Sequence, residues 1–179
     1  MPTPDFIVAM REQLGNRELW FSGVTAIVLK PAPKDAPIWV VPEVLLVQRA
    51  DNKQWTPVTG IVDPGEEPHE AALREIKEET GLDASVAALL GVGKVGPVTY
   101  PNGDIAGYYD TAFRCTVDAD AQPYVADDES VAVGWFPISG LPPLQPRFRL
   151  LIGDAAAEMN QPLGFQPRMG YVKREQRGR

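Results

Sequence analysis

The sequence predicts a single α/β domain, because strand-like runs rich in β-branched residues lie on both sides of a strongly helical segment. Its 179 residues are enough to build one hydrophobic core without disulfides or structural metals. Hydrophobic residues make up 44% of the chain and charged residues 23%, which is ordinary for a globular domain. This composition excludes a wholly disordered chain, a collagen-like repeat and a coiled coil.

The elements expected before the central helix are a short helix and two strands. Residues 5–14 place their apolar side chains on roughly one face and are followed by Gly15, which predicts a helix that packs on the domain. The aliphatic runs 24–29 and 44–49 predict two buried strands that form a hairpin-like pair. A Pro-rich connection joins them, and we expect a loop over residues 50–67.

The central helix is predicted over residues 68–80, since Pro68 suits a first helical turn and Gly81 stands where a helix ends. Strands are expected next, separated by a turn-rich YPNGD sequence, and an amphipathic helix closes the domain. These later elements are expected at residues 85–95, 108–117 and 131–136 for the strands and at 146–159 for the helix.

The chain is therefore divided into a lead-in over residues 1–23 that packs on the domain, a main domain over 24–160 and a basic tail over 161–179. We expect the tail to be a disordered end, with an intermolecular arm as the alternative.

The charge is acidic and concentrated in two segments. The formal net charge is -7. Residues 60–82 hold seven acids and two bases, residues 118–129 hold five acids and no base, and residues 168–179 hold five bases and one acid. An acidic surface repels polymeric nucleic acid and anionic membranes, so neither is expected as a partner.

Cysteine and histidine are almost absent. The single cysteine, Cys115, allows no intramolecular disulfide and favours a reducing compartment, so a cytoplasmic location is expected. The single histidine, His69, makes a multi-histidine zinc site or a Ser-His-Asp triad improbable. The amino terminus does not resemble a signal peptide, and no apolar run is long enough to span a bilayer.

The chemistry is concentrated in the sequence GIVDPGEEPHEAALREIKEETGL, residues 60–82. Glu75, Glu78 and Glu79 stand at i, i+3 and i+4 and project from one face of the predicted helix. Glu66 can reach the same region, and Arg74 can pair with a neighbouring carboxylate. Hard oxygen ligands without His or Cys suit Mg²⁺, or Mn²⁺, better than zinc. The alternative is a solvated acidic face with i, i+4 ion pairs.

The same residues resemble the signature of the Nudix hydrolases, G-x5-E-x7-R-E-U-x-E-E-x-G-U, where U is a bulky aliphatic residue. Every specified position matches: Gly60, Glu66, Arg74, Glu75, Ile76, Glu78, Glu79, Gly81 and Leu82. The resemblance implies an α/β/α sandwich with a mixed β-sheet and a catalytic helix at about residues 67–80. It covers about residues 24–159.

The resemblance also implies a Mg²⁺-dependent pyrophosphohydrolase that acts on a nucleoside diphosphate linked to another moiety. The implied metal ligands are the carbonyl of Gly60 and the carboxylates of Glu66, Glu75, Glu78 and Glu79. Metal ions would neutralise the pyrophosphate and lower the pKa of a bound water. The general base is expected to be Glu75 or Glu78, with Glu129 as the alternative, and Arg74 orients the acids.

Candidate substrate-binding residues lie outside the signature. Arg49 closes a strand, Trp55 can stack on a base or anchor its loop, and Tyr100 and Asp104 can line a nucleoside pocket or form a turn. ADP-ribose or a nucleotide sugar is the first substrate expected, followed by dinucleoside polyphosphates and (d)NTPs. The subfamily marks Pro97 and Tyr100 point to different substrates.

Two other functions stay open at this stage. A non-catalytic nucleotide sensor or partner-binding module with the same fold is the first alternative, and an acidic domain that docks a basic partner is the second. Many relatives are homodimers, so the resemblance is compatible with a homodimer.

Overall fold

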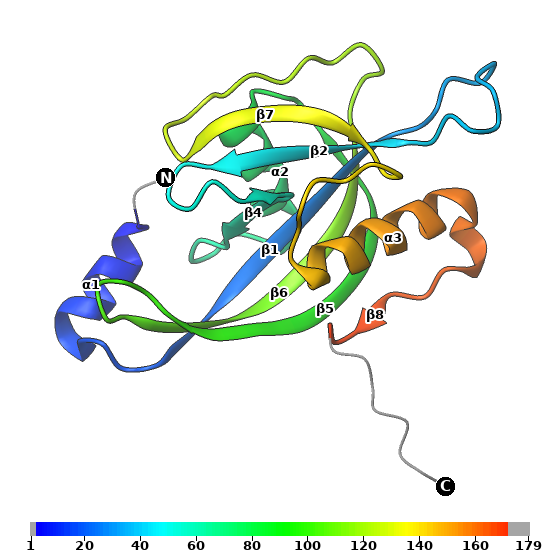
Figure 1. The fold of residues 1–179 in the computed structure, drawn as a ribbon. Helices are drawn as coiled ribbons and strands as arrows, with labels where there is room; N and C mark the ends of the chain where they lie inside the picture. The colour runs from blue at the N-terminus through cyan, green and yellow to red at the C-terminus, as the bar shows by residue number, and fades with distance from the viewer. Residues whose placement is uncertain (1–2, 172–179) are drawn as a thin grey trace, which may run out of the picture.

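A computed structural model describes residues 3–171, which form one body with a sheet between two helices (Figure 1). The elements in chain order are α1 (Asp5–Leu14), β1 (Leu19–Lys30), β2 (Glu43–Arg49), β3 (Trp55–Thr56), β4 (Val58–Ile61), α2 (Pro68–Thr80), β5 (Ser85–Thr99), β6 (Ile105–Thr116), β7 (Ser130–Pro137), α3 (Pro146–Asn160), a short 3₁₀ turn (Pro162–Gly164) and β8 (Arg168–Met169).

The sheet is mixed and is organised around the long strand β1. Along one side β1 runs parallel to β6, from Leu19 opposite Ala106 to Val28 opposite Cys115. On its other side β1 pairs antiparallel with β4 and, at its end, with β2. The strand order is β3-β2-β1-β6-β5-β8, with β4 paired to β1 and β7 paired to β2.

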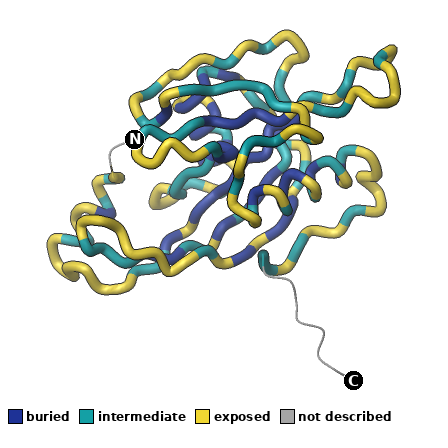
Figure 2. Tube along the Cα trace, in the orientation of Figure 1, coloured by how far each residue is buried: buried dark blue, intermediate teal, exposed yellow. Residues whose placement is uncertain are grey.

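The two faces of the sheet are covered by different helices. Successive side chains of a strand point to opposite faces, so the buried residues of β1 divide between two cores. Val24, Ala26 and Val28 belong to a cluster that contains Ala72 of α2. Ile27 and Leu29 belong to a second cluster, which contains Leu151, Ile152 and Ala155 of α3. The α/β/α sandwich is thereby confirmed, and Figure 2 shows its buried layer along the central strands.

Helix α2 begins and ends where the sequence predicts. Pro68 occupies the first turn, and Glu67 and Glu70 form a capping box that satisfies backbone N–H groups at the start of the helix. Gly81 adopts a left-handed conformation with φ 71° directly after Thr80, a geometry that costs glycine little. The helix that carries the acidic residues therefore has a fixed start and end.

The lead-in packs against the far end of the β5–β6 hairpin. Ile7 of α1 is buried with Phe21 and Ala106. The guanidinium of Arg11 donates hydrogen bonds to the carbonyl oxygens of Gly15, Arg17 and Ile105, at 2.6–3.1 Å. These contacts hold α1 beside the hairpin as one wall of the molecule (Figure 1).

Several element bounds differ from the sequence-based expectation. The segment expected to be a loop over 50–67 contains the short strands β3 and β4, because Val58 to Ile61 pair with β1. Strand β1 starts five residues early, at Leu19, since its first residues pair with β6. Strand β5 continues to Thr99, and β6 starts at Ile105, directly after the expected turn. The bounds of these strands depend on the strands they pair with as well as on their own composition, so the sequence alone does not predict them.

The beginning of the expected tail is part of the fold. Arg168 and Met169 form β8, which pairs parallel with Gly91 and Val92 of β5. A Cβ atom on Gly91 would lie 2.5 Å from the carbonyl oxygen of Arg168, so glycine lets the two backbones approach. Residues 172–179 of that tail lie outside the described residues. Across residues 3–171, none of the helices has the length and apolar character needed to cross a membrane.

Candidate active site

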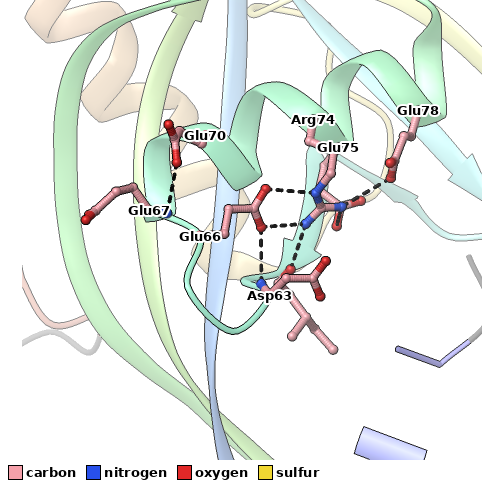
Figure 3. Close-up of polar contacts among 8 residues, drawn as sticks. Asp63, Glu66, Glu67, Glu70, Arg74, Glu75 and Glu78 are labelled. Carbon is pink, nitrogen blue, oxygen red and sulfur yellow. Dashed lines mark hydrogen bonds and ion pairs between the residues drawn. The ribbon is translucent and has the colours of Figure 1, made fainter. Parts of the chain in front are cut away.

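Arg74 lies at the centre of the acidic region, on α2 (Figure 3). Its Nε and Nη2 form a two-pronged contact with the Glu66 carboxylate at 2.9 and 3.0 Å, and Nη2 also donates to the Ile61 carbonyl oxygen at 3.0 Å. Nη1 donates to Glu75 at 2.9 Å and to Glu78 at 3.1 Å. A guanidinium has five N–H donors, and all five are used here. Arg74 therefore ties the loop after β4 to the acidic face of α2.

The three helix acids occupy different environments. Glu75 and Glu79, one turn apart, are only 4% and 6% exposed, whereas the Glu78 side chain is 40% exposed. Burial raises the pKa of Glu75 to about 7, against the opposing effect of Arg74. Burial also raises the pKa of Glu79 to about 8, and the nearby Glu75 and Asp127 carboxylates add to the shift. Helical spacing correctly places the acids on neighbouring positions, but packing buries two of them and leaves the third at the surface.

Glu66 behaves differently from the buried pair. Arg74 lowers the pKa of Glu66 by direct hydrogen bonding, and the backbone N–H of Asp63 donates to the same carboxylate at 3.1 Å. Glu66 therefore remains ionised and holds its loop against α2, as Figure 3 shows.

Gly60 lies directly against the Glu75 carboxyl group. A Cβ atom built on Gly60 would come within 2.1–2.2 Å of the Glu75 carboxyl group, which is shorter than any non-bonded contact allows. Val24 pairs with Gly60 across the sheet, so the strand cannot simply retreat. Glycine is required here because the carboxylate occupies the space of a side chain.

The side chains fit a hard divalent cation in their chemistry. Glu75 and Glu79 are buried carboxylates whose charged forms lack sufficient compensation, as their raised pKa values indicate. Oxygen donors of this kind suit Mg²⁺ or Mn²⁺. Within residues 3–171, no three acidic, His or Cys side chains converge as a preformed metal cluster. Arg74 instead draws Glu66, Glu75 and Glu78 to itself.

A cleft of about 670 Å³ opens beside this region. Its walls include six residues singled out from the sequence, namely Arg49, Gly60, Glu75, Tyr100, Asp104 and Glu129. The cleft is also lined by α1, by the β5–β6 hairpin and by the first turn of α3. The fold thus brings the end of β2, the signature segment and the hairpin turn to one cavity.

The candidate substrate-binding residues are distributed unevenly around the cleft. Tyr100 and Tyr108 face one another across the hairpin, with their hydroxyl oxygens 2.6 Å apart. Asp104 lies 3.4 Å from Nε of Arg11 in the opposing helix. Arg49 forms a two-pronged contact with Asp51 at 3.0 Å at the cleft entrance, and hydrogen bonding to Asp51 raises the pKa of Arg49.

Trp55 has a packing role. Its ring stacks edge-on against Phe136, with ring centroids 4.8 Å apart, at the core that underlies α3. Of the two interpretations of Trp55, the structure favours the loop anchor over the base-stacking platform. Its position follows from pairing with Gln48, which directs the ring toward β7.

Sequence reasoning missed a second polar group in the cleft. Asp110 comes from β6, Arg147 from α3 and Tyr171 from the second position after β8, and they meet where the first turn of α3 approaches the sheet. The sequence signal that could have pointed to this group is the pair Gly91 and Gly93 in β5, which leaves room for the chain around Arg168 and Tyr171. The space above Gly93 is filled by the Tyr171 ring, 2.8–2.9 Å from where a Cβ would lie.

An α/β/α sandwich with an acidic helix beside a deep cleft defines the class of protein. The family model described as NUDIX domain matches residues 23–153. The chain therefore belongs to the Nudix family, as the signature at residues 60–82 predicts.

Similar proteins carry several activities in their names. The chain is 33% identical over 130 residues to the human "8-oxo-dGDP phosphatase NUDT18", covering 66% of this chain and 36% of that protein. It is 35% identical over 102 residues to the "Putative nudix hydrolase 1" of Caenorhabditis elegans, covering 55% and 26%. The chain spans roughly a quarter to just over a third of the length of these relatives.

Solved structures share the fold at low sequence identity. The "UDP-X diphosphatase" structure is 20% identical with a TM-score of 0.60, over 93% of this chain and 74% of that chain. An ADP-ribose pyrophosphatase from Streptococcus suis is 18% identical with a TM-score of 0.58, over 84% and 97%. These likenesses establish the architecture.

Proposed function

We propose that the protein is a Mg²⁺-dependent pyrophosphohydrolase that cleaves the pyrophosphate of a nucleoside diphosphate linked to another moiety. The observation that carries the proposal is the burial of Glu75 in the wall of the cleft, against Gly60 and beside Arg74. Glu75 and Glu79 are both buried one turn apart on α2, and two desolvated carboxylates are costly unless a cation joins them, so the arrangement favours metal binding.

The proposed metal ligands are the carbonyl of Gly60 and the carboxylates of Glu66, Glu75, Glu78 and Glu79. Mg²⁺, when bound, supplies charge neutralisation of the pyrophosphate and a more acidic water. Arg74 holds Glu66, Glu75 and Glu78 in place through four hydrogen bonds, and Gly60 leaves room for Glu75. Mn²⁺ fits the same oxygen donors.

The proton acceptor is proposed to be a carboxylate that faces the cleft. Glu75 and Glu129 both line it, from α2 and from the residue before β7. Glu78 is the weaker candidate because its side chain is 40% exposed and does not line the cleft. Glu129→Gln separates Glu129 from the helix acids: a large loss of kcat with unchanged Mg²⁺ affinity identifies Glu129, whereas full kcat leaves the role to Glu75 or Glu78.

ADP-ribose or a nucleotide sugar is the first substrate we propose, with dinucleoside polyphosphates and (d)NTPs next. Relatives or structural neighbours are named for ADP-ribose, UDP-X, 8-oxo-dGDP and bis(5'-nucleosyl)-tetraphosphate. Tyr100 and Tyr108 give the cleft an aromatic wall on which a base can stack.

The test is a substrate panel with and without Mg²⁺, in ¹⁸O-labelled water with product identification. Glu79→Gln should lower kcat by at least about 10²-fold, as is typical for loss of one catalytic group. Asp83→Asn, which removes the same charge from a 90% exposed side chain just beyond α2, is the matched control and should match the wild type. A Glu79→Gln variant as active as the parent would overturn the assignment. Tight nucleotide binding without turnover at any divalent ion would favour a sensor instead.

We also propose action in a reducing compartment such as the cytoplasm, on small nucleotides rather than on nucleic acid polymers. Cys115 is fully buried, and burial raises the pKa of its thiol to about 12, so the thiol is inert and structural. The family resemblance is compatible with a homodimer, and the sedimentation coefficient of the purified chain distinguishes a dimer from a monomer.

A further inference from the structure

Arg147 is a largely buried arginine of the cleft whose donors are poorly used. It lies in the first turn of α3, lines the cleft, and its side chain is 21% exposed. Its Nε is buried and has no hydrogen-bond partner within the described residues. Nη1 lies 3.4 Å from the Thr25 hydroxyl oxygen and 3.7 Å from Asp110 Oδ2, both at the long limit of polar contact.

The neighbours of Arg147 hold its side chain in position but leave some of its N–H donors without a close hydrogen-bond acceptor. Its guanidinium carbon lies 4.0 Å from the centre of the Phe148 ring, which fixes the plane of the group. Asp110, the nearest acid, is engaged elsewhere: Tyr171 donates to its carboxylate at 2.7 Å, and Thr25 donates at 2.9 Å. The buried carboxylate is thus shared among three groups, and the guanidinium retains donors for another acceptor.

A largely buried, positively charged guanidinium with unused donors favours an anionic acceptor, because hydrogen bonds between charged groups are the stronger ones. Its planar fork matches the oxygens of a phosphate. The start of α3 adds a partial positive charge at the same place, and Gln145 at the N-cap makes no side-chain capping bond.

The Arg147 region and the acidic residues of α2 are close enough for one ligand to contact both. Gly60 pairs with Val24 on one side of β1, and Asp110 pairs with Gly23 on the other. Two strand spacings, or about 10 Å, therefore separate the backbones of the two sites. The phosphates of one nucleotide can reach both ends of this span within the same cleft.

We propose that Arg147 forms an anion subsite that binds a phosphate group of the substrate, opposite the acidic helix in the cleft. The inference rests on the proposed function and extends it: the substrate carries a phosphate that the α2 acids do not hold. Arg147 is assigned a binding role, and Tyr171 and Asp110 are positioning residues that keep its surroundings fixed.

The experiment measures binding of methylenediphosphonate, a diphosphate analogue that cannot be hydrolysed and carries no base, by calorimetry in Mg²⁺. Arg147→Met should raise its Kd by about 10–100-fold, the range for loss of a hydrogen bond to a charged group. Binding of Mg²⁺ alone should be unchanged. Arg149→Met removes the same charge from the same helix, at an exposed side chain that donates to the Pro142 carbonyl, and should bind the analogue normally.

The outcomes separate this inference from the proposed function. Equal Kd values for Arg147→Met and wild type overturn the anion subsite and leave the hydrolase assignment intact. Wild-type protein that binds neither Mg²⁺ nor the analogue overturns both. If the methionine variant does not fold, Arg147→Lys replaces it: a several-fold higher Kd supports the fork geometry, and a wild-type Kd overturns it.

Discussion

Two arginines, Arg74 on α2 and Arg147 in the cleft wall, show what hydrogen-bond saturation means for function. Arg74 uses all five of its N–H donors on Glu66, Glu75, Glu78 and the Ile61 carbonyl, at 2.9–3.1 Å. Arg147 makes only contacts of 3.4 Å and longer, and its Nε has no partner in the described residues. A saturated arginine organises its own protein, whereas an unsaturated one is available to a ligand.

The two arginines also differ in the charges around them, which shift their pKa values in opposite directions. Arg74 lies among carboxylates that raise its pKa, chiefly through its hydrogen bonds with Glu66, so its charge is strongly stabilised. Burial lowers the pKa of Arg147, and Asp110 opposes this only in part. Removing Arg74 should therefore damage the fold and kcat, while removing Arg147 should mainly weaken substrate binding.

The largest effect is expected from Arg74→Met. It leaves Glu75 buried without its cation, and breaking such a pair costs about 3 kcal/mol of unfolding free energy. Urea denaturation and kcat should both show the loss. Lys77→Met removes an exposed partner of Asp83 on the same helix and should cost less than about 1 kcal/mol. If the two variants prove equally stable, Arg74 does not stabilise the fold by holding Glu66, Glu75 and Glu78.

Mg²⁺ should stabilise the wild-type chain against heat. At a free concentration about 100-fold above Kd the gain is about 2.7 kcal/mol, and excess EDTA should remove it. Arg147→Met should keep the full response, and Glu79→Gln should lose most of it. A response that survives in Glu79→Gln would move the metal site away from α2.

Gly60→Ala should lower stability by about 1–3 kcal/mol and reduce kcat, because its Cβ would overlap the Glu75 carboxyl group. Gly153→Ala is the control: it lies in α3 with nothing within 4 Å of a new Cβ, and should be neutral or stabilising. Calorimetric melting of the two variants distinguishes crowding of Glu75 from a general effect of replacing glycine.

Tyr171→Phe should cost about 1–2 kcal/mol, since it removes a 2.7 Å hydrogen bond to the buried Asp110 carboxylate. Tyr109→Phe alters a 61% exposed tyrosine and should change the melting temperature very little. The Mg²⁺ response of Tyr171→Phe should equal that of the wild type. A reduced response would show that the Asp110 region is coupled to the acidic helix.

The smallest effect is expected from Asp51→Asn. The Arg49–Asp51 pair is exposed, at 41% and 58% of the respective side chains, so its loss should cost less than about 1 kcal/mol. A larger loss of unfolding free energy in urea would show that Arg49 is also structural.

The sequence predicted much of the site because helical spacing is local. Pro68, Gly81 and the spacing of the acids were sufficient to place α2, and Gly60, Glu75 and Glu129, which the sequence singles out as site candidates, line one cavity. Trp55 was ambiguous because an aromatic residue near a strand end can face either a core or a cleft. Only its distance from Phe136 decides between them.

The residues around Arg147 were not predicted from the sequence, because they lie far apart in the chain. Thr25, Asp110 and Arg147 belong to three different elements, Tyr171 follows β8, and the four carry no common motif. Strand β8 was missed for the same reason: two residues pair with β5 only once the α3 helix has returned the chain to that edge.

By itself, the sequence determined the family, the central helix and the acidic residues, since these depend on spacing within about twenty residues. The tertiary structure alone decided which acids are buried, which arginine is saturated and where the cleft lies. Burial and hydrogen-bond satisfaction depend on segments brought together from the whole chain. The same residue type therefore organises the protein at position 74 and remains available at position 147.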